Sequence, residues 1–254
     1  MRGPTSGPVA VAVRWFDELD STNAEARRLA EAGETGPLWI AARRQTAGRG
    51  RRGRVWESGE GNLAATLLMT TDRPPAQAAQ LSFVTALAVG DMVGAWVPDE
   101  KIGFKWPNDV QLDGAKLGGI LIESGQAAEG RLWLAIGIGI NLAAPPEGLD
   151  QPVTAIRQHL RAGLEPSQPE EALAVLSRSL SSRIQAWDVD GFEPVRAAWL
   201  QSAVGMGRTC SARVGQGVLA GIAEGLDVDG ALLLRLDSGE VRRITAGDVV
   251  FGSS

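Results

Sequence analysis

The sequence changes character at residue 202, and this change constrains the fold more than any other feature. Before it, apolar runs of strand length alternate with longer helical segments. After it, residues 203–254 alternate between polar and apolar types, with hairpin signals of Asp-Gly and Ser-Gly type. We predict an α+β domain over residues 10–202, a mixed β-sheet packed with helices, followed by a small all-β barrel over residues 203–254. Residues 1–9 are predicted to be a flexible leader.

The composition excludes several classes of protein. The formal net charge is −5 and the isoelectric point is about 5.1, whereas general nucleic-acid binders are usually basic. A single cysteine, Cys210, and a single histidine, His159, exclude a disulfide framework and a zinc site of the histidine/cysteine type. No apolar run reaches the length needed to cross a bilayer. We expect a cytoplasmic protein with no membrane contact.

Residues 48–54, here called the Arg/Gly loop, combine four arginines with three glycines. Three uses compete: a dinucleotide-binding loop, a nucleic-acid-binding arm, or a mobile clamp for a small anionic ligand. The spacing fits G-x-G-x-x-G, but no helix follows, which excludes the dinucleotide interpretation. Glycine freedom and like-charge repulsion predict a loop that is mobile until carboxylate or phosphate groups neutralise it. A solvated basic surface loop explains this segment equally well when it is taken alone.

Periodicity and end signals predict the main elements. An opening strand near residues 9–17 precedes a helix whose N-cap is Ser21 or Thr22; Glu25 stands at capping-box spacing from Thr22, and Gly33 supplies the stop. Further strands and helices are predicted, in chain order, at residues 37–43, 62–70, 77–97 (one long buried helix), 103–141 (several antiparallel strands), 169–187 and 192–201.

Three further stretches hold candidate site residues. In "KWPNDV", Asn108 and Asp109 present polar groups beside a strand end. Lys116 precedes an apolar strand whose glycines allow close approach of another group. Gly137 and Gly139 alternate on a later strand, so both face the same side and leave a groove for a slender ligand. Turn chemistry or close sheet packing would explain each stretch taken singly.

Together and in this order, the motifs closely resemble those of the biotin–protein ligases (biotin–[acetyl-CoA-carboxylase] ligases). They are "STN" (21–23), "QTAGRGRRGRVW" (45–56), "KWPND" (105–109), "KLGGILIE" (116–123) and "GIGIN" (137–141), and "GIAEGLDVDGALLL" (221–234) is similar to the family's C-terminal SH3-like barrel. The resemblance implies a catalytic domain with the class II aminoacyl-tRNA-synthetase-like (biotin ligase) fold. Because "STN" begins at residue 21, it also implies a monofunctional form without the N-terminal DNA-binding domain of some members, and no DNA partner.

The resemblance implies an ATP-dependent ligase. Members join biotin to ATP, releasing pyrophosphate and forming biotinyl-5′-adenylate, and then pass the biotinyl group to one lysine of a biotin carboxyl carrier domain. The implied ligands are biotin and ATP with Mg²⁺, and members occur as sheet-edge homodimers and as monomers. The alternatives are a lipoate- or octanoyl-transferring relative of the same fold, and a nucleic-acid-binding protein that uses the Arg/Gly loop.

The resemblance also implies site residues, position by position. Biotin would contact Ser21, Thr22, Asn23, Gln45, Gly48, Arg49, Gly50, Arg51, Trp56, Lys116, Gly119 and Gly137. ATP or the adenylate would contact Arg49, Arg51, Arg54, Asn108, Lys116 and Asn141. The catalytic groups would be Arg49, Lys116 and Asp109, since fixed cations cancel the repulsion between a carboxylate and a triphosphate. Asn108 and Asp109 would lie near Mg²⁺, unless Asp109 orients or deprotonates the acceptor lysine.

Overall fold

The large sheet has the strand order β1-β2-β3-β7-β6-β5-β4. β1 pairs with β2 in parallel, and the other neighbouring pairs are antiparallel. Its strands are β1 (Ala12–Leu19), β2 (Leu38–Gln45), β3 (Leu63–Thr71), β4 (Ile102–Lys105), β5 (Asp109–Leu112), β6 (Ala115–Gln126) and β7 (Leu132–Ile140). The computed structural model describes residues 11–215 and 217–251, so the leader predicted for residues 1–9 lies outside the described residues.

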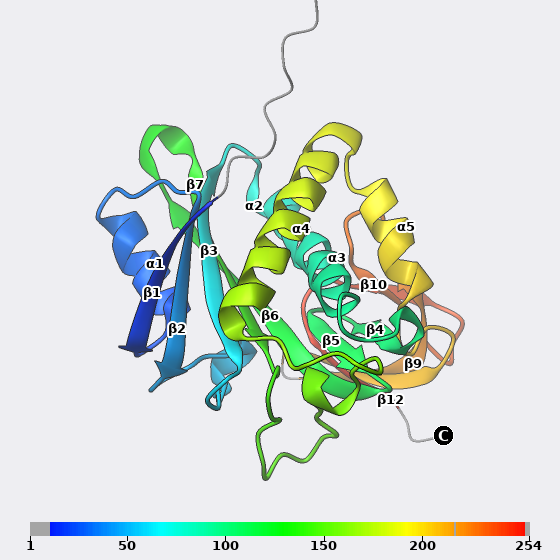
Figure 1. Cartoon of the computed structure of the whole chain (residues 1–254). Coiled ribbons are helices and arrows are strands. Elements are labelled where there is room, and N and C mark those ends of the chain that lie inside the picture. Colours follow the sequence, from blue (N-terminus) through cyan, green and yellow to red (C-terminus); the bar gives the residue numbers. More distant parts are fainter. Residues whose placement is uncertain (1–10, 216, 252–254) are drawn as a thin grey trace, which may run out of the picture.

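Helices cover both faces of this sheet (Figure 1). α1 packs against β2, β3 and β7 on one face, α3 and α4 pack on the other, and α5 lies beside α3. The helices are α1 (Thr22–Glu31), α2 (Pro75–Ala78), α3 (Leu81–Val93), α4 (Pro169–Asp190) and α5 (Glu193–Gln201), with short 3-10 turns η1 (Arg51–Gly53), η2 (Asp99–Lys101), η3 (Ala128–Gly130) and η4 (Ile156–Gln158). Within the described ranges, no helix is long and apolar enough to cross a membrane.

Side-chain alternation along β7 separates the two layers. Leu134 and Ile136 are buried in the main core with α3 and α4, while Ala135 packs in a smaller cluster beneath α1. Gly137 and Gly139 lie on the same face of the sheet as Ala135, the face that α1 covers, because every second residue of a strand faces the same side. The two glycines therefore share a face, which confirms that part of the sequence prediction.

The start of α1 differs from the capping-box expectation. Ser21 is the N-cap, and its Oγ accepts a hydrogen bond from the Ala24 N–H at 3.4 Å. Glu25 pairs with Arg28 at 2.8 Å and so does not complete a capping box with Thr22. The spacing allows either Ser21 or Thr22 to be the N-cap. The extended backbone of Ser21 identifies Ser21 as the N-cap.

The single helix predicted for residues 77–97 is also wrong in its bounds. The segment holds the end of α2, a break at residues 79–80, and α3, which ends at Val93. Trp96 and Val97 are buried in the turn that follows. Their apolar character therefore reports burial in the core and not helical structure.

The small sheet follows α5 and is antiparallel, in the order β11-β10-β9-β8-β12. Its strands are β8 (Thr209–Val214), β9 (Gly217–Leu226), β10 (Leu232–Arg235), β11 (Val241–Ile244) and β12 (Asp248–Phe251). It is joined to the large domain, because the Trp106 indole N–H donates to the Gly230 carbonyl at 3.1 Å and Ala203 bridges to Phe104 of β4. The α+β class with a C-terminal β domain is confirmed, while the boundary at residue 202 stays a prediction.

Candidate active site

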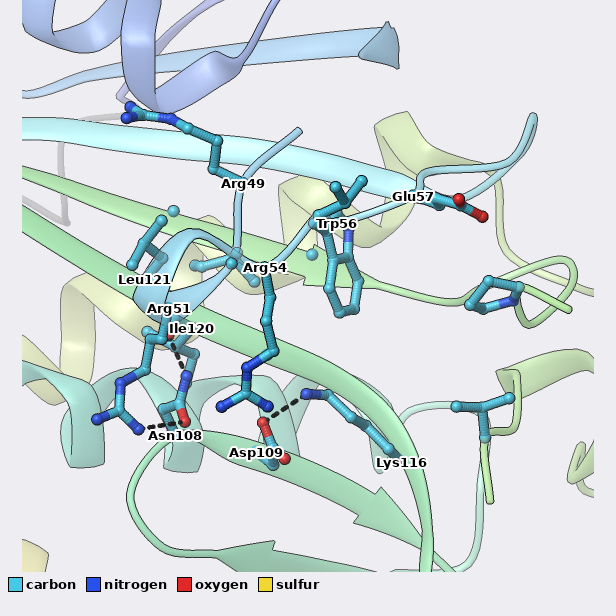
Figure 2. A pocket seen from close by; sticks show the side chains of 18 of the residues that line it. Arg49, Arg51, Arg54, Trp56, Glu57, Asn108, Asp109, Lys116, Ile120 and Leu121 are labelled. Carbon is cyan, nitrogen blue, oxygen red and sulfur yellow. Dashed lines mark hydrogen bonds and ion pairs between the residues drawn. The ribbon is translucent and has the colours of Figure 1, made fainter. Parts of the chain in front are cut away.

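One cavity of about 460 Å³ brings the distant motifs together. Its walls come from β6 and β7, from the Arg/Gly loop and from β12 of the small sheet. Figure 2 shows Arg51 and Arg54 of the loop beside Asn108, Asp109 and Lys116. Its lining includes the predicted site residues Ser21, Thr22, Asn23, Gln45, Arg49, Gly50, Arg51, Arg54, Trp56, Asn108, Asp109, Lys116, Gly119, Gly137 and Asn141. The remaining predicted residue, Gly48, lies at the base of the loop, where its carbonyl accepts from the Trp56 N–H at 2.9 Å.

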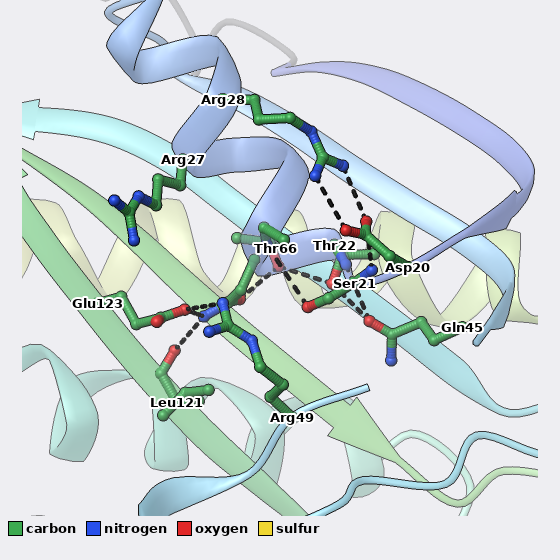
Figure 3. Close-up of polar contacts among 12 residues, drawn as sticks. Asp20, Ser21, Thr22, Arg27, Arg28, Gln45, Arg49, Thr66, Leu121 and Glu123 are labelled. Carbon is green, nitrogen blue, oxygen red and sulfur yellow. Dashed lines mark hydrogen bonds and ion pairs between the residues drawn. The ribbon is translucent and has the colours of Figure 1, made fainter. Parts of the chain in front are cut away.

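The neutral end of the cavity is a chain of hydrogen bonds at the start of α1 (Figure 3). Gln45 Oε1 accepts from the Thr22 N–H at 2.9 Å and lies 3.2 Å from the Thr22 hydroxyl. The Thr66 hydroxyl lies 2.8 Å from Thr22 Oγ1 and 2.7 Å from Asn23 Oδ1. These three side chains of residues 22, 23 and 66 are almost fully buried. Buried hydroxyls and amides select a polar ring by direction, because water does not compete with them.

An ion pair holds the turn that leads into α1. Arg28 donates to both carboxylate oxygens of Asp20, at 2.8 and 2.9 Å, and Asp20 accepts from the Ser21 N–H at 2.7 Å. The hydrogen bonds from Arg28 lower the pKa of Asp20 to about 2. The Ala47 N–H donates to the Asp20 carbonyl at 2.8 Å, so the same turn also anchors the start of the Arg/Gly loop.

Glycines of β6 and β7 form the floor of the cavity. A Cβ at Gly137 would collide with the Asn23 amide, and a Cβ at Gly139 would collide with the Trp56 indole. Gly119 of β6 lies opposite Gly139, with Asp109 and Lys116 at ordinary contact distance. Asn23 and Trp56 therefore rest directly on β7, and only glycine permits this at either position.

The Arg/Gly loop folds back on itself at the cavity mouth. The Gly50 N–H donates to the Arg54 carbonyl at 2.7 Å, and Arg49 bridges to Val55. Arg52 at φ 57° and Gly53 at φ 74° both adopt the left-handed region. The glycine accounts for part of this tight turn, while Arg52 holds a conformation that most residues avoid.

Each arginine of the loop has a carboxylate partner. Arg49 Nη2 lies 3.2 Å from Glu123 Oε2 of β6. Arg54 Nη2 and Arg52 Nη1 lie 2.5 and 3.4 Å from Asp248 Oδ2, at the start of β12. These ion pairs offset the like-charge repulsion that the sequence predicts for the loop.

Arg51 is the least exposed of the four loop arginines, at 23%. Its guanidinium donates to Asn108 Oδ1 at 3.2 Å and to the Gly247 carbonyl at 3.1 Å, and it lies 3.8 Å from Asp248. Burial lowers the pKa of Arg51, and the nearby Asp248 carboxylate opposes that shift. A partly desolvated guanidinium gains more from an anionic ligand than an exposed one does.

Lys116 and Asp109 form an ion pair beside the loop (Figure 2). Lys116 Nζ lies 2.8 Å from Asp109 Oδ1 and 5.8 Å from the centre of the Trp56 ring. The Lys116 N–H donates to the Pro152 carbonyl, and its carbonyl accepts from the Thr154 N–H, each at 2.9 Å. This backbone pairing holds the amine where the glycine floor meets the arginines.

Asn141, just beyond the end of β7, carries an unsatisfied oxygen. Its Nδ2 donates to the Thr154 carbonyl at 3.0 Å, whereas Oδ1 has no hydrogen-bond partner among the described residues. Asn141 is 2% exposed and lines the cavity. A buried oxygen of this kind costs about 1–3 kcal/mol when unpaired, which favours a ligand that donates to it.

Sequence reasoning missed three residues at the site. Thr66 carries a buried hydroxyl within the apolar run of β3. This break in the apolar pattern is the sequence signal that could have identified it as a site residue. Glu123 is the last residue of the "KLGGILIE" motif, and no role is predicted for it from the sequence. Asp248 belongs to the small sheet. The residues next to it in the sequence do not indicate a contact with a loop about two hundred residues earlier.

The predicted Mg²⁺ contacts fit only in part. Across residues 11–215 and 217–251, no group of three or more His, Cys, Asp or Glu side chains is arranged to hold a metal ion. Asn108 directs Oδ1 towards Arg51 and donates from Nδ2 to the Ile120 carbonyl at 2.7 Å. Asp109 supplies a carboxylate, the ligand that Mg²⁺ prefers. This donor set suits a metal held mainly by phosphate oxygens, with Asp109 as the protein contact.

The glycine-floored groove runs from a neutral hydrogen-bonding end to a cluster of cations, which is an arrangement suited to a ligase that joins a slender acid to a phosphate compound. Residues 15–141 match the Biotin/lipoate A/B protein ligase family, and residues 205–252 match the Biotin protein ligase C terminal domain. The chain is 43% identical over 240 residues to a biotin–[acetyl-CoA-carboxylase] ligase of Paracoccus denitrificans, covering 92% of this chain and 98% of that protein. The chain belongs to the biotin protein ligase family.

Two solved structures are similar over nearly the whole chain. Biotin protein ligase of Aquifex aeolicus in complex with biotin and ATP superposes with a TM-score of 0.77 at 26% identity, covering 96% of this chain and 99% of that chain. Biotin protein ligase of Leishmania major in complex with biotinyl-5-AMP superposes with a TM-score of 0.62 at 25% identity, covering 92% and 99% respectively.

Proposed function

We propose that this cavity is where the protein activates biotin with ATP and from which it transfers the biotinyl group to a carrier lysine. The biotin ligase activity itself follows from the family and from the 43% identity to the Paracoccus ligase. The observation that carries the assignment to this cavity is the meeting of five sequence motifs around one glycine-floored groove.

The neutral end takes the ureido ring of biotin. Thr22, Asn23 and Gln45 present hydroxyl and amide groups there, with Ser21 beside them at the helix cap. The bicyclic ring and its tail then lie along Gly137 and Gly119, with Trp56 closing over them. A ring system that carries both N–H donors and a carbonyl acceptor suits this set, whereas the dithiolane ring of lipoate offers neither.

The cationic end carries out adenylation. A biotin carboxylate oxygen attacks the α-phosphorus of ATP, the bond from that phosphorus to the bridging oxygen breaks, and pyrophosphate leaves. Both reactants are anions, so fixed cations must offset their repulsion and the charge that builds in the transition state. Lys116 lies where carboxylate and α-phosphate would meet, and Arg49, Arg51 and Arg54 surround the phosphates. Phosphate oxygens would replace the carboxylates that these groups contact now.

The adenine end and the metal complete the site. Asn141 Oδ1, which is buried and unpaired, would accept a hydrogen bond from the adenine amino group. Mg²⁺ would reach the site on the phosphates of ATP, with Asp109 as its protein oxygen and Asn108 positioning Arg51. Bound Mg²⁺ would share the negative charge of the phosphates.

The second half-reaction uses the same groups. The acceptor amine attacks the biotinyl carbonyl carbon, AMP leaves, and the amine loses a proton, which Asp109 would accept. The Arg/Gly loop covers the mixed anhydride and keeps water from it until the acceptor arrives. The acceptor is a lysine of a biotin carboxyl carrier domain, and the single buried cysteine fits the cytoplasmic location that this partner implies.

Biotin-dependent exchange of labelled pyrophosphate into ATP tests this function, with lipoate and octanoate as competing acids. We expect exchange with biotin and none above background with the other two. Exchange with lipoate alone would favour the lipoate-transferring relative. Salt-dependent DNA binding with no exchange by any acid would favour the nucleic-acid interpretation of the Arg/Gly loop.

A further inference from the structure

The Glu123 carboxylate joins the two ends of the cavity. One of its oxygens, Oε2, accepts from Asn23 Nδ2 at 2.8 Å and from Arg49 Nη2 at 3.2 Å (Figure 3). We propose that Glu123 is a positioning residue that sets the orientation of the Asn23 amide and of the Thr66 hydroxyl at the neutral end of the cavity, and so contributes to recognition of the ureido ring. This inference rests on the proposed function.

A carboxylate only accepts hydrogen bonds, and this fixes the orientation of Asn23. Its amino group must face Glu123, and the second hydrogen of that group reaches the Leu121 carbonyl at 3.2 Å. Asn23 Oδ1 must then point the other way, towards Thr66. Without the charge on Glu123, only the longer hydrogen bond to the Leu121 carbonyl would hold the amide in this orientation.

The orientation passes from Asn23 to Thr66 and Thr22. Because Asn23 Oδ1 is an acceptor, the single hydroxyl proton of Thr66 is directed to it over 2.7 Å. Thr66 Oγ1 is then left as an acceptor facing Thr22 Oγ1, 2.8 Å away, and Gln45 Oε1 is a second acceptor 3.2 Å from the same Thr22 hydroxyl. The Thr22 proton is used within this network in either case, so Thr22 Oγ1, which lines the cavity, is left there as an acceptor. The negative charge of Glu123 at one end of this hydrogen-bond network therefore leaves Thr22, at the other end, as an acceptor of N–H groups.

Packing prevents the network from adapting by other means. Thr66 is fully buried, Asn23 is 3% exposed, and the Asn23 amide lies so close to Gly137 that a Cβ there would collide with it. Biotin presents two ureido N–H donors and one carbonyl acceptor, and Gln45 Nε2, which donates one hydrogen to Ser58 Oγ at 3.4 Å, has a second hydrogen for that carbonyl.

The test replaces Glu123 by glutamine, which keeps the shape of the side chain and can donate as well as accept. Glu123→Gln should raise the KM for biotin in pyrophosphate exchange by about tenfold, as loss of a charge-assisted hydrogen bond predicts. The KM for ATP should change by less than twofold. The preference for biotin over 2-iminobiotin, in which an imine replaces the urea oxygen, should shrink because the Asn23 amide and the Thr66 hydroxyl are then less firmly oriented.

Two further variants isolate the cause. Thr66→Val removes the middle hydroxyl without touching Arg49, and it should give the same selective rise in the KM for biotin. Glu129→Gln changes the charge equally at a side chain that is 83% exposed, and it should behave as wild type. Thermal unfolding checks that each variant is folded.

A folded Glu123→Gln protein with the wild-type KM for biotin and the wild-type preference over 2-iminobiotin would overturn the inference. Equal losses for biotin and ATP in both test variants would also overturn it, since they indicate a general structural effect. Absence of exchange by the wild-type protein would instead refute the proposed function itself, so the two failures are distinguishable.

Discussion

The two ends of the cavity are built in opposite ways. At the neutral end, Thr22, Asn23 and Thr66 come from α1 and β3, are at most 4% exposed, and are bonded to one another. At the cationic end, Arg49 and Arg54 come from a loop, are 43% and 58% exposed, and are paired with carboxylates from other elements. The neutral end is therefore formed by regular structure before any ligand binds, whereas the cationic end is held by ion pairs that a ligand can exchange.

This difference follows from the energetics of the two kinds of group. Neutral hydrogen bonds in a buried network are rigid, since each unpaired group would cost about 1–3 kcal/mol. Exposed ion pairs contribute only about 0–1 kcal/mol each, so replacing a carboxylate by a phosphate is easy. We expect variants at the neutral end to change affinity for biotin, and variants at the cationic end to change chemistry and retention of the intermediate.

Replacing Lys116 should produce the largest effect and would test the cationic end most directly. Lys116→Ala removes the amine that we propose to lie between carboxylate and α-phosphate, so we expect adenylation to fall by about a hundredfold or more with biotin affinity changed far less. Pyrophosphate exchange and calorimetric binding of biotin measure the two quantities. Lys101→Ala, which removes an ion pair with Asp113, is the control. Near-normal exchange by Lys116→Ala would remove Lys116 from the mechanism.

Adding a methyl group to the floor of the groove should come next. Gly139→Ala places a Cβ against the Trp56 indole, and we expect the KM for biotin to rise by about tenfold because overpacking costs about 1–3 kcal/mol. Gly59→Ala is the control, since its Cβ would meet only the Asn62 side chain at an ordinary 3.6 Å. If Gly139→Ala bound biotin as wild type does, the contact between Trp56 and β7 would not contribute to the biotin site.

Removing Arg49 should separate retention from binding. Arg49→Ala should leave the fold intact but release biotinyl-adenylate about tenfold faster, because the loop loses a charge-assisted contact to the intermediate. Rapid filtration after a single turnover measures the release rate. Arg44→Ala, an exposed arginine paired with Glu18, provides the comparison. Retention equal to wild type would contradict the assignment of the loop as a cover.

The smallest effect is expected at the small sheet. Asp248→Asn removes the carboxylate on which Arg52 and Arg54 converge, so tryptic cleavage within residues 49–54 should become a few times faster in the ligand-free protein. Biotin with ATP should abolish the difference, because phosphates then pair with the arginines. Asp237→Asn, in an exposed turn of the same sheet, is the control. A cleavage rate unchanged by Asp248→Asn would mean that the small sheet does not hold the loop.

Local patterns predicted the glycine floor and most of the strands. The alternation of Gly137 and Gly139 requires a shared face, and that face is the one beneath α1. The helix bounds near residues 77–97 were predicted less well, because α3 is buried on nearly every side and its apolar run continues into the next turn. Periodicity reports a helix only where one side of it is solvated.

The sequence by itself determined the α+β class, the small C-terminal β domain and the chemical character of the site, because these depend on short-range periodicity and on residue types at fixed spacings. Only the tertiary structure decided which carboxylates meet the loop arginines and how Asn23 is oriented. Glu123, Thr66 and Asp248 reach the site from β6, β3 and β12, and their contacts span many residues of chain. Such long-range contacts depend on how the sheets and α1 pack together, which no local pattern encodes.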